Sequence, residues 1–211
     1  MNLFKKSIEM TKITHLFFDI GGVCLSNGWD HISREQSANL FGYDFVESDK
    51  KHYKIAPLFE KGNISRDDYL DEVIFYKKRE FSKNEIIEFM ENQSVGHTSS
   101  LDVLGKLCSQ GNYHISTLNN ESLELNEFRI EKFGLAEYFT NFFSSCYLKV
   151  KKPETEIFQM VLRITQKKGE QCLFIDDREE NVEGAKKCGF HTLHLPHVED
   201  LEKLLMEKGI I

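Results

Sequence analysis

Residues 16–23 read LFFDIGGV and residues 173–178 read LFIDDR, and these two stretches give the strongest structural signal in the chain. Each is a short apolar run that stops at a carboxylate, which is typical of a buried strand in a parallel sheet. Ligands of such sheets bind in the crevice beyond the carboxyl ends of the strands. If the two strands are neighbours, Asp19, Asp176 and Asp177 come together in one pocket.

Three neighbouring carboxylates need a positive charge nearby, because without one they cannot all stay ionised within a few ångströms of one another. Lys152, which precedes Pro153 at the expected start of a helix, is one candidate for this counter-charge. Mg2+ is the other candidate, since this hard cation prefers oxygen ligands. The sequence therefore predicts an acidic pocket that is neutralised by a lysine or by a metal ion.

The composition fits a soluble enzyme with one core and a small accessory domain. The chain has 211 residues, of which 40% are hydrophobic, so it can bury a sizeable core. A formal net charge of −7 without a basic stripe argues against a nucleic-acid partner and against an acidic membrane surface. The five cysteines are odd in number and never spaced Cys-x-x-Cys, which favours reduced thiols. Because the sequence has neither a signal peptide nor a run of about 18 apolar residues, we expect a cytoplasmic protein without membrane contact.

The middle of the first half of the chain reads as helices only. Helical apolar spacing covers residues 30–41, 44–60, 65–79 and 82–91. Two of these helices open with capping boxes, formed by Ser65 with Asp68 and by Ser82 with Glu85. We therefore expect residues 26–96 to form an all-helical cap domain.

The second half alternates helices with short strands. The expected strands are residues 113–117, 142–144, 173–175 and 191–195, and the expected helices between them are residues 121–133, 153–169 and 181–188. This alternation predicts a doubly wound, Rossmann-like parallel sheet that is covered on both faces. Residues 1–25 and 97–211 should together form this α/β core domain, with the cap inserted after the first strand.

Four segments occur in a specific order along the chain. They are DIGGV at 19–23, TLNN at 117–120, KPE at 152–154 and FIDDREEN at 174–181. In this order the chain resembles the haloacid dehalogenase superfamily, most closely its phosphatase-like members with a helical cap after the first strand. The resemblance extends over nearly the whole chain, and it implies Mg2+ as the cofactor and a small phosphorylated metabolite as the partner.

The resemblance also implies the catalytic roles. Asp19 is the expected nucleophile, which becomes an aspartyl-phosphate and so divides a difficult transfer to water into two easier displacements. Lys152 is expected to neutralise the transferring phosphoryl oxygens and to restrain Asp19. By the same resemblance, Mg2+ is bound by Asp19, by the backbone carbonyl of Gly21 and by Asp177.

The remaining positions are expected to support the metal or the phosphate. Asp176 and Asn181 should orient the metal ligands without contacting the metal themselves. Gly22 should let a backbone N–H group approach the phosphate closely. Asn119 and Asn120 are the expected side-chain donors to the phosphate from the loop after the second strand.

Two positions depart from the family pattern. Gly21 stands where most phosphatases of the family have a second aspartate, the general acid that protonates the leaving group. Such an acid is worth roughly two to four orders of magnitude in rate. Leu118 stands where the family has a serine or threonine.

These departures leave three functions open. The first, which we expect, is a Mg2+-dependent phosphomonoester hydrolase acting on a small metabolite such as a sugar phosphate. The second is a metal-independent 2-haloacid dehalogenase, which also lacks the second aspartate but has no use for an acidic pair that must be neutralised. The third is a catalytically weak, ligand-binding or scaffolding protein, since a fold alone does not establish a function. The substrate, the oligomeric state and the cap residues that face the substrate are left open by the sequence.

Overall fold

The computed structural model describes residues 12–211, so the expected core segment 1–25 lies partly outside the described residues. Five strands form one parallel sheet in the order β3-β2-β1-β4-β5. The strands are β1 (His15–Phe18), β2 (His114–Asn119), β3 (Asn141–Ser144), β4 (Cys172–Asp176) and β5 (His191–His194). The expected doubly wound α/β sheet is thus confirmed.

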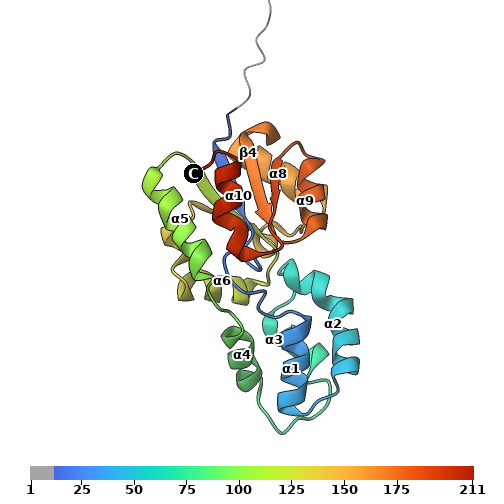
Figure 1. Ribbon diagram of the computed structural model, residues 1–211. Helices are drawn as coiled ribbons and strands as arrows, with labels where there is room; N and C mark the ends of the chain where they lie inside the picture. The colour runs from blue at the N-terminus through green and yellow to red at the C-terminus, as the bar shows by residue number, and fades with distance from the viewer. Residues whose placement is uncertain (1–11) are drawn as a thin grey trace, which may run out of the picture.

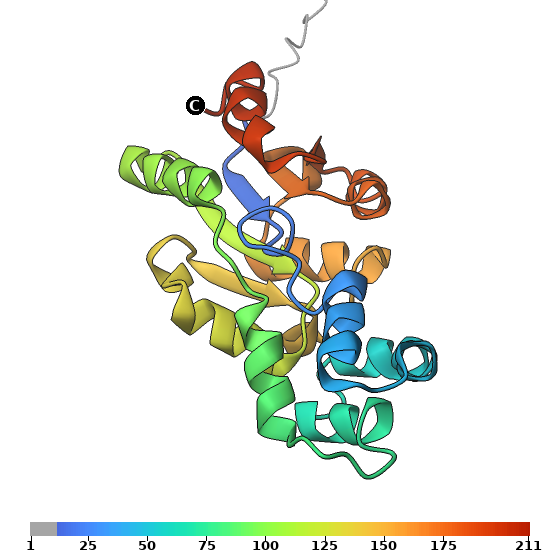
Figure 2. The same cartoon turned by 60° about the horizontal axis from the view of Figure 1, so that its bottom comes forward.

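Helices cover both faces of the sheet (Figures 1 and 2). They are α5 (Thr98–Gln110), α6 (Leu123–Lys132), α7 (Ser145–Leu148), α8 (Thr155–Thr165), α9 (Glu179–Lys186) and α10 (Leu201–Glu207), with short 3-10 turns η1 (Leu135–Glu137), η2 (Gly169–Gln171) and η3 (Val198–Asp200). Successive residues of a strand point to opposite faces. In β1, Leu16 and Phe18 therefore share an apolar cluster with α5 and α10, whereas Phe17 shares another with α8 and α9.

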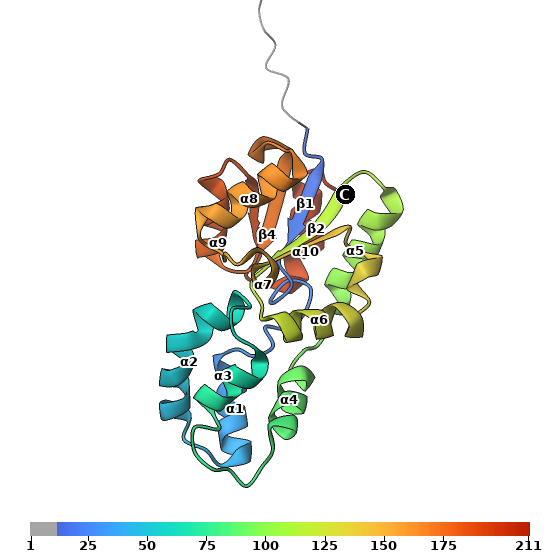
Figure 3. The same cartoon turned by 180° about the vertical axis from the view of Figure 1, so that it is seen from behind.

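Four further helices form a separate body next to the carboxyl edge of the sheet (Figures 1 and 3). We call them the cap helices: α1 (His31–Phe41), α2 (Phe45–Glu60), α3 (Arg66–Val73) and α4 (Lys83–Asn92). They pack around an apolar cluster of their own, which Leu125 of α6 also joins. The capping boxes at Ser65 and Ser82 are both present. The residue ranges given above for the two domains stay a prediction.

Two paired chain segments connect the cap helices to the sheet. Leu25 and Gly96 form an antiparallel bridge, and the Ser26 N–H group donates to the carbonyl of Val95 at 2.8 Å. The Ser26 hydroxyl also donates to the carbonyl of Gln93 at 2.6 Å. Because the outgoing and returning segments are bonded to each other, they form one joint between the two bodies.

The cap helices touch the core a second time, at the carboxyl end of α2. Lys61 pairs with Glu154 at 3.0 Å, and Lys151 pairs with Glu60. These ion pairs link α2 to the segment before α8 and so hold the cap helices over the carboxyl edge of the sheet.

Several expected helix boundaries were wrong. Helix α3 ends at Val73 instead of Arg79, because the chain turns there and the Phe75 N–H group bonds back to the Leu70 carbonyl at 2.9 Å. Helix α6 begins at Leu123, so Glu121 lies in the loop before it. Helix α8 runs only from Thr155 to Thr165, and the left-handed residue Gln166 (φ 56°) ends it.

No helix within residues 12–211 is long and apolar enough to cross a membrane.

The order of the strands places the ligand crevice. The chain leaves β1 toward β2 on one side and returns from β3 to β4 on the other, so the direction of winding reverses between β1 and β4. Ligands of open α/β sheets bind outside the carboxyl ends of the strands at such a switch point. Here Phe18 lies opposite Ile175, so the next residues, Asp19 and Asp176, emerge side by side.

Candidate active site

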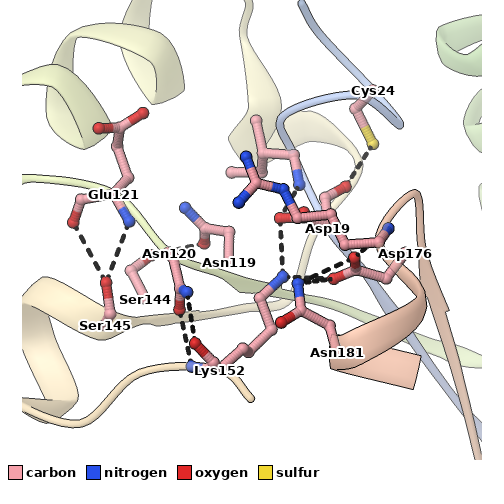
Figure 4. A network of polar contacts seen from close by, with 12 residues as sticks. Asp19, Cys24, Asn119, Asn120, Glu121, Ser144, Ser145, Lys152, Asp176 and Asn181 are labelled. Atoms are coloured by element: carbon pink, nitrogen blue, oxygen red, sulfur yellow. Dashed lines mark hydrogen bonds and ion pairs between the residues drawn. The ribbon is translucent and has the colours of Figure 1, made fainter. Parts of the chain in front are cut away.

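Asp19, Asp176 and Lys152 form the centre of the site (Figure 4). Lys152 comes from the loop before α8 and reaches between the two strands, with its Nζ atom 3.0 Å from Asp19 Oδ1 and 2.6 Å from Asp176 Oδ2. The Lys152 side chain is only 1% exposed. The lysine is thus the counter-charge inside the acidic pocket that the sequence predicts.

Burial and the neighbouring opposite charges shift the pKa values of Asp19 and Lys152 in opposite directions. Burial raises the pKa of Asp19 to about 7, with Lys152 lowering it and the carboxylates of Asp176 and Asp177 adding to the rise. Desolvation alone would lower the pKa of Lys152, but the attraction of Asp176 and Asp19 outweighs it and the pKa is raised. Lys152 therefore stays an ammonium ion, and three ionised carboxylates around it would still leave an excess of negative charge.

Only one oxygen of Asp19 contacts other groups within residues 12–211. The Ile20 N–H group donates to Oδ1 at 2.8 Å, and Lys152 contacts the same oxygen. Neither contact uses Oδ2, and the Asp19 side chain lines a cavity. Oδ2 is therefore the oxygen that is available for chemistry.

The two adjacent aspartates of the fourth segment have different surroundings. Asp176 is fully buried and accepts hydrogen bonds from Lys152, from the Arg178 N–H group at 2.8 Å and from the Asn181 side chain at 3.0 and 3.1 Å. Asp177 Oδ1 is buried too, but it has no hydrogen-bond partner among residues 12–211. Desolvation and the neighbouring Asp176 raise the pKa of Asp177. An unpartnered carboxylate oxygen in an acidic pocket fits a bound cation.

Oxygen atoms of Asp19, Asp176 and Asp177 all lie within 4.8 Å of one another. Lys152 and Asn181 already donate hydrogen bonds to the Asp176 carboxylate. Among these three aspartates, the oxygens that are available to a metal ion therefore belong to Asp19 and Asp177. Carboxylate oxygens without nitrogen or sulfur ligands suit Mg2+ better than zinc.

Gly22 makes room for Asp177. It has a φ of +74°, and a Cβ atom at this position would lie 2.3 Å from Asp177 Oδ2. Its N–H group donates to the Leu25 carbonyl at 2.7 Å, so this N–H is used inside the turn. The structure thus gives Gly22 a different role from the expected phosphate contact: it lets Asp177 approach Asp19.

A cavity of about 360 Å³ opens between the carboxyl edge of the sheet and the cap helices. Its floor contains Asp19, Gly21, Asn120, Lys152 and Asn181. The wall on the side of the cap helices combines aromatic and charged residues, namely Trp29, Asp30, His31, Arg34, His52, Tyr53, Phe59 and Glu60.

The haloacid dehalogenase-like hydrolase family matches residues 13–189, which is most of the chain. This protein is a member of that family. The resemblance noted in the sequence is thereby confirmed.

Individual relatives are similar over nearly the same length. Flavin mononucleotide hydrolase 1 of Arabidopsis thaliana, a chloroplast protein by its name, is 24% identical over 90% of this chain and 86% of its own. A haloacid dehalogenase family enzyme of Bacteroides thetaiotaomicron, solved in complex with magnesium and inorganic phosphate, is 25% identical with a TM-score of 0.74, covering 86% of this chain and 93% of its own. A HAD-like hydrolase of Porphyromonas gingivalis has 21% identity and a TM-score of 0.69, covering 90% and 97%.

The two asparagines of the second segment behave differently in this hydrolase. Asn120 binds the backbone of Lys152 twice, donating to its carbonyl and accepting from its N–H group, both at 2.9 Å. Asn119 is 2% exposed and does not line the cavity. Ser144 donates to its Oδ1 at 2.8 Å (Figure 4), and its Nδ2 donates to Asn126 at 3.0 Å. The structure therefore brings Asn120 to the site as a support for Lys152 and does not bring Asn119 to the cavity. Leu118 packs into the apolar core of the sheet.

Sequence reasoning missed several charged residues that the hydrolase places around the cavity. They are Arg34, Glu121, Arg129 and Arg178. Arg129 could have been noticed, because a buried arginine four positions after the buried Leu125 interrupts the apolar face of α6. Glu121 was missed because the expected helix began at residue 121, which placed its side chain on the surface of that helix.

His52 is a neutral hydrogen-bond donor in the cavity wall. The indole N–H of Trp29 donates to the Tyr69 hydroxyl at 2.9 Å, and this hydroxyl lies 2.7 Å from His52 Nδ1. Because tryptophan only donates, the arrangement that uses every proton has Tyr69 donating to Nδ1 and leaves the imidazole proton on Nε2. Burial, followed by the charge of Arg34, lowers the pKa of His52 to about 4.

We expect Gly22→Ala to remove most metal-dependent activity of the hydrolase while it still folds. The new Cβ would collide with Asp177 and displace it, and a positive φ costs a non-glycine residue roughly 1 kcal/mol or more. Gly42→Ala is the matched control, because Gly42 has a φ of +70° with nothing within 4 Å of the added atom. Titration of Mg2+ binding by calorimetry should show weakened binding for Gly22→Ala and unchanged binding for Gly42→Ala. Equal Mg2+ affinity in both variants would contradict the role given to Gly22.

The low pKa of His52 predicts a pH-dependent stability. An unfolded histidine takes up a proton below about pH 6.5, whereas the folded one stays neutral to about pH 4. The stability contributed by neutral His52 is therefore present above pH 6.5 and is lost as the pH falls toward 4. Urea unfolding should show that wild type loses about 2–3 kcal/mol more than His52→Gln between pH 7 and pH 4.5. Parallel pH profiles for the two proteins would show that this histidine titrates normally.

Proposed function

We propose that the protein is a Mg2+-dependent phosphomonoester hydrolase that acts on a small metabolite of the cytoplasm through an aspartyl-phosphate intermediate. The observation that carries this proposal is the arrangement of Asp19, Lys152 and Asp177. Among the described residues, one oxygen of Asp19 has no partner, the buried ammonium of Lys152 lies beside this carboxylate, and an unpartnered oxygen of Asp177 shares the same pocket. The similarity to a flavin mononucleotide hydrolase and to an enzyme solved with magnesium and phosphate supports it.

The proposed reaction has two displacements at phosphorus. Asp19 attacks phosphorus through Oδ2, the bond from phosphorus to the leaving oxygen breaks, and that oxygen departs as the alcohol after it takes a proton from water. Water then attacks the aspartyl-phosphate and releases inorganic phosphate and free Asp19. Lys152 lies 3.0 Å from Asp19 Oδ1, so its charge orients the nucleophile and stabilises the transferring phosphoryl group in both steps.

The residues present fit a magnesium ion. Asp19 and Asp177 would hold it, together with the backbone carbonyl of Gly21. Asp176 and Asn181 would support these ligands, since Asn181 and Lys152 fix Asp176. Bound there, Mg2+ would neutralise charge on the phosphoryl oxygens and the acidic pocket.

The cavity suggests the size and chemistry of the substrate. Its volume of about 360 Å³ suits a small metabolite, and its wall offers both aromatic surface and hydrogen-bonding groups. Trp29, Tyr53 and Phe59 can contact a ring, while His52 can donate to a polar group on it. A phosphate monoester with a sugar or a polar ring as its leaving group fits this wall.

The same acidic pair counts against a metal-independent dehalogenase. Displacement of halide from carbon by Asp19 gives no role to the unpartnered oxygen of Asp177. A cation at this oxygen is required for phosphoryl transfer and not for dehalogenation.

Hydrolysis of p-nitrophenyl phosphate tests the proposal, because its good leaving group barely needs an acid. We expect turnover with Mg2+ and its loss with EDTA, restored when Mg2+ is added back. Halide release from a 2-haloacid in EDTA is the parallel assay, and there we expect none. No Mg2+-dependent turnover of p-nitrophenyl phosphate or of a panel of metabolite phosphates would overturn the proposal.

A further inference from the structure

A positive charge lies beside the position of the missing general acid. Gly21 has no side chain, and the site of its absent Cβ atom is 3.2 Å from Asn27 Oδ1 and 3.9 Å from Nη1 of Arg129. Gly21 and Arg129 both line the cavity that holds Asp19. A guanidinium group therefore borders the space where a leaving group would be protonated in most phosphatases of the family.

This guanidinium group is held rigidly from several sides. Arg129 is 2% exposed, its Nε donates to Ser94 Oγ at 3.0 Å, and its Nη2 donates to the Ser26 carbonyl at 2.9 Å. A Cβ atom at Gly28, where φ is +67°, would lie 2.0 Å from Nη2, so glycine there leaves room for the group. The orientation of Arg129 is thus fixed before any substrate binds.

Among the described residues, the charge of Arg129 is paired with a single carboxylate. Nη1 pairs with Glu121 Oε2 at 3.0 Å, and burial raises the pKa of Glu121 although Arg129 opposes the rise. A guanidinium group has five N–H donors, of which Nη1 carries two. Nη1 forms this ion pair but donates no hydrogen bond within residues 12–211, so its N–H groups are available next to Gly21.

We propose that Arg129 stabilises the negative charge that develops on the leaving oxygen, in place of the proton that an acid at position 21 would supply. This role rests on the proposed function. As the bond from Asp19 to phosphorus forms, the bond to the leaving oxygen breaks and the electron pair stays on that oxygen. The oxygen then takes a proton from water, and the resulting hydroxide is neutralised by the proton released when a second water opens the aspartyl-phosphate.

A fixed cation is suited to this task. It needs no proton of its own, and in a cavity of low dielectric it acts more strongly than it would in water. Removing one preorganised donor to a developing oxyanion costs about a hundredfold to a thousandfold in rate. The stabilisation should matter most for poor leaving groups, because more charge accumulates on their oxygen.

The test is the dependence of kcat/KM on the acidity of the leaving alcohol. This ratio reports steps up to the first irreversible one, the loss of the alcohol. The substrates are p-nitrophenyl phosphate, phenyl phosphate and an alkyl phosphate, measured with wild type, Arg129→Lys, Arg129→Gln and Lys151→Gln. We expect Arg129→Gln to lower the alkyl phosphate rate about a hundredfold and the p-nitrophenyl phosphate rate less than about fivefold. Arg129→Lys should recover part of the difference, and Lys151→Gln, which removes another cavity cation, should leave the slope unchanged.

Glu121→Gln keeps the assay informative if Arg129 variants fail to fold. It leaves the hydrogen bonds of Arg129 to Ser94 and Ser26 intact and removes only the opposing charge, so we expect a shallower slope than in wild type. An equal loss for all substrates in Arg129→Gln, or an unchanged slope in Glu121→Gln, would overturn the role of Arg129. Failure of the proposed function would look different, since wild type itself would then show no Mg2+-dependent turnover.

Discussion

We expect Asp19→Asn to lower kcat for p-nitrophenyl phosphate by at least about a thousandfold, because loss of the nucleophile removes the covalent route. The amide has nearly the same shape as the carboxylate, so the strand, the Ile20 contact and the cavity should persist. The measurement is steady-state turnover in saturating Mg2+, with circular dichroism to check folding. Acid quenching during turnover should also trap labelled phosphate on wild type and not on the variant.

Asp30→Asn is the matched control for this experiment. Asp30 also lines the cavity, but its side chain caps α1 by accepting from the Ser33 N–H group at 2.8 Å. Asparagine caps helices about as well as aspartate, so folding should not change. We expect the control to keep turnover within about tenfold of wild type, since loss of general substrate contacts costs far less than loss of a nucleophile. A folded Asp19→Asn protein with turnover close to that of the control would rule out Asp19 as the nucleophile.

Lys152→Met should lower the free energy of unfolding by about 3–5 kcal/mol at pH 7 in EDTA, because removing one partner of a buried ion pair leaves uncompensated charge. Lys152 is almost completely buried between Asp19 and Asp176, and methionine fills a similar volume without the ammonium group. In the variant the carboxylates hold protons more tightly when folded than when unfolded. The deficit should therefore shrink as the pH falls. Urea unfolding at several pH values measures it.

Two further proteins separate the charge effect from packing. Lys151→Met removes the neighbouring lysine, which pairs with Glu60 nearer the surface, and should cost about 1 kcal/mol or less. Adding Asp176→Asn to Lys152→Met should recover part of the lost stability, because one of the unneutralised carboxylates is then gone. If the double variant is less stable than Lys152→Met by the full cost of Asp176→Asn alone, the two side chains do not interact and the charge explanation is wrong.

The sheet was predictable because its signal is local. An apolar run ending in aspartate, as at Asp19 and Asp176, predicts both a buried strand and the edge at which its carboxylate emerges. Capping boxes likewise depend on residues three apart, as at Ser65 and Ser82. Helix ends that depend on distant packing were not predictable in this way. The chain turns after Val73 because Phe75 and Phe81 pack against the apolar cluster of the cap helices. No glycine or proline marks that turn in the sequence.

The site was predictable to the extent that it lies at strand ends. Asp19, Lys152 and Asp177 meet because the topology joins their segments. Asn119 was expected at the phosphate, but its direction is set by Ser144 on the next strand, which sequence spacing alone does not reveal. The position of Arg129 depends on two connecting segments far away in the chain, and such long-range contacts leave only the weak signal of a charge on an apolar helix face.

The contact between Trp29 and Tyr69 gives this protein a built-in optical reporter. Trp29 is the sole tryptophan of the chain, it lines the cavity, and its indole N–H is bonded to the Tyr69 hydroxyl. A molecule that contacts the indole ring in the cavity changes the surroundings of that one ring. Fluorescence excited at the indole band should therefore change when such a molecule binds, without a label and without overlap from a second tryptophan. Unmodified metabolites can be tested for binding to the wild-type protein by this signal.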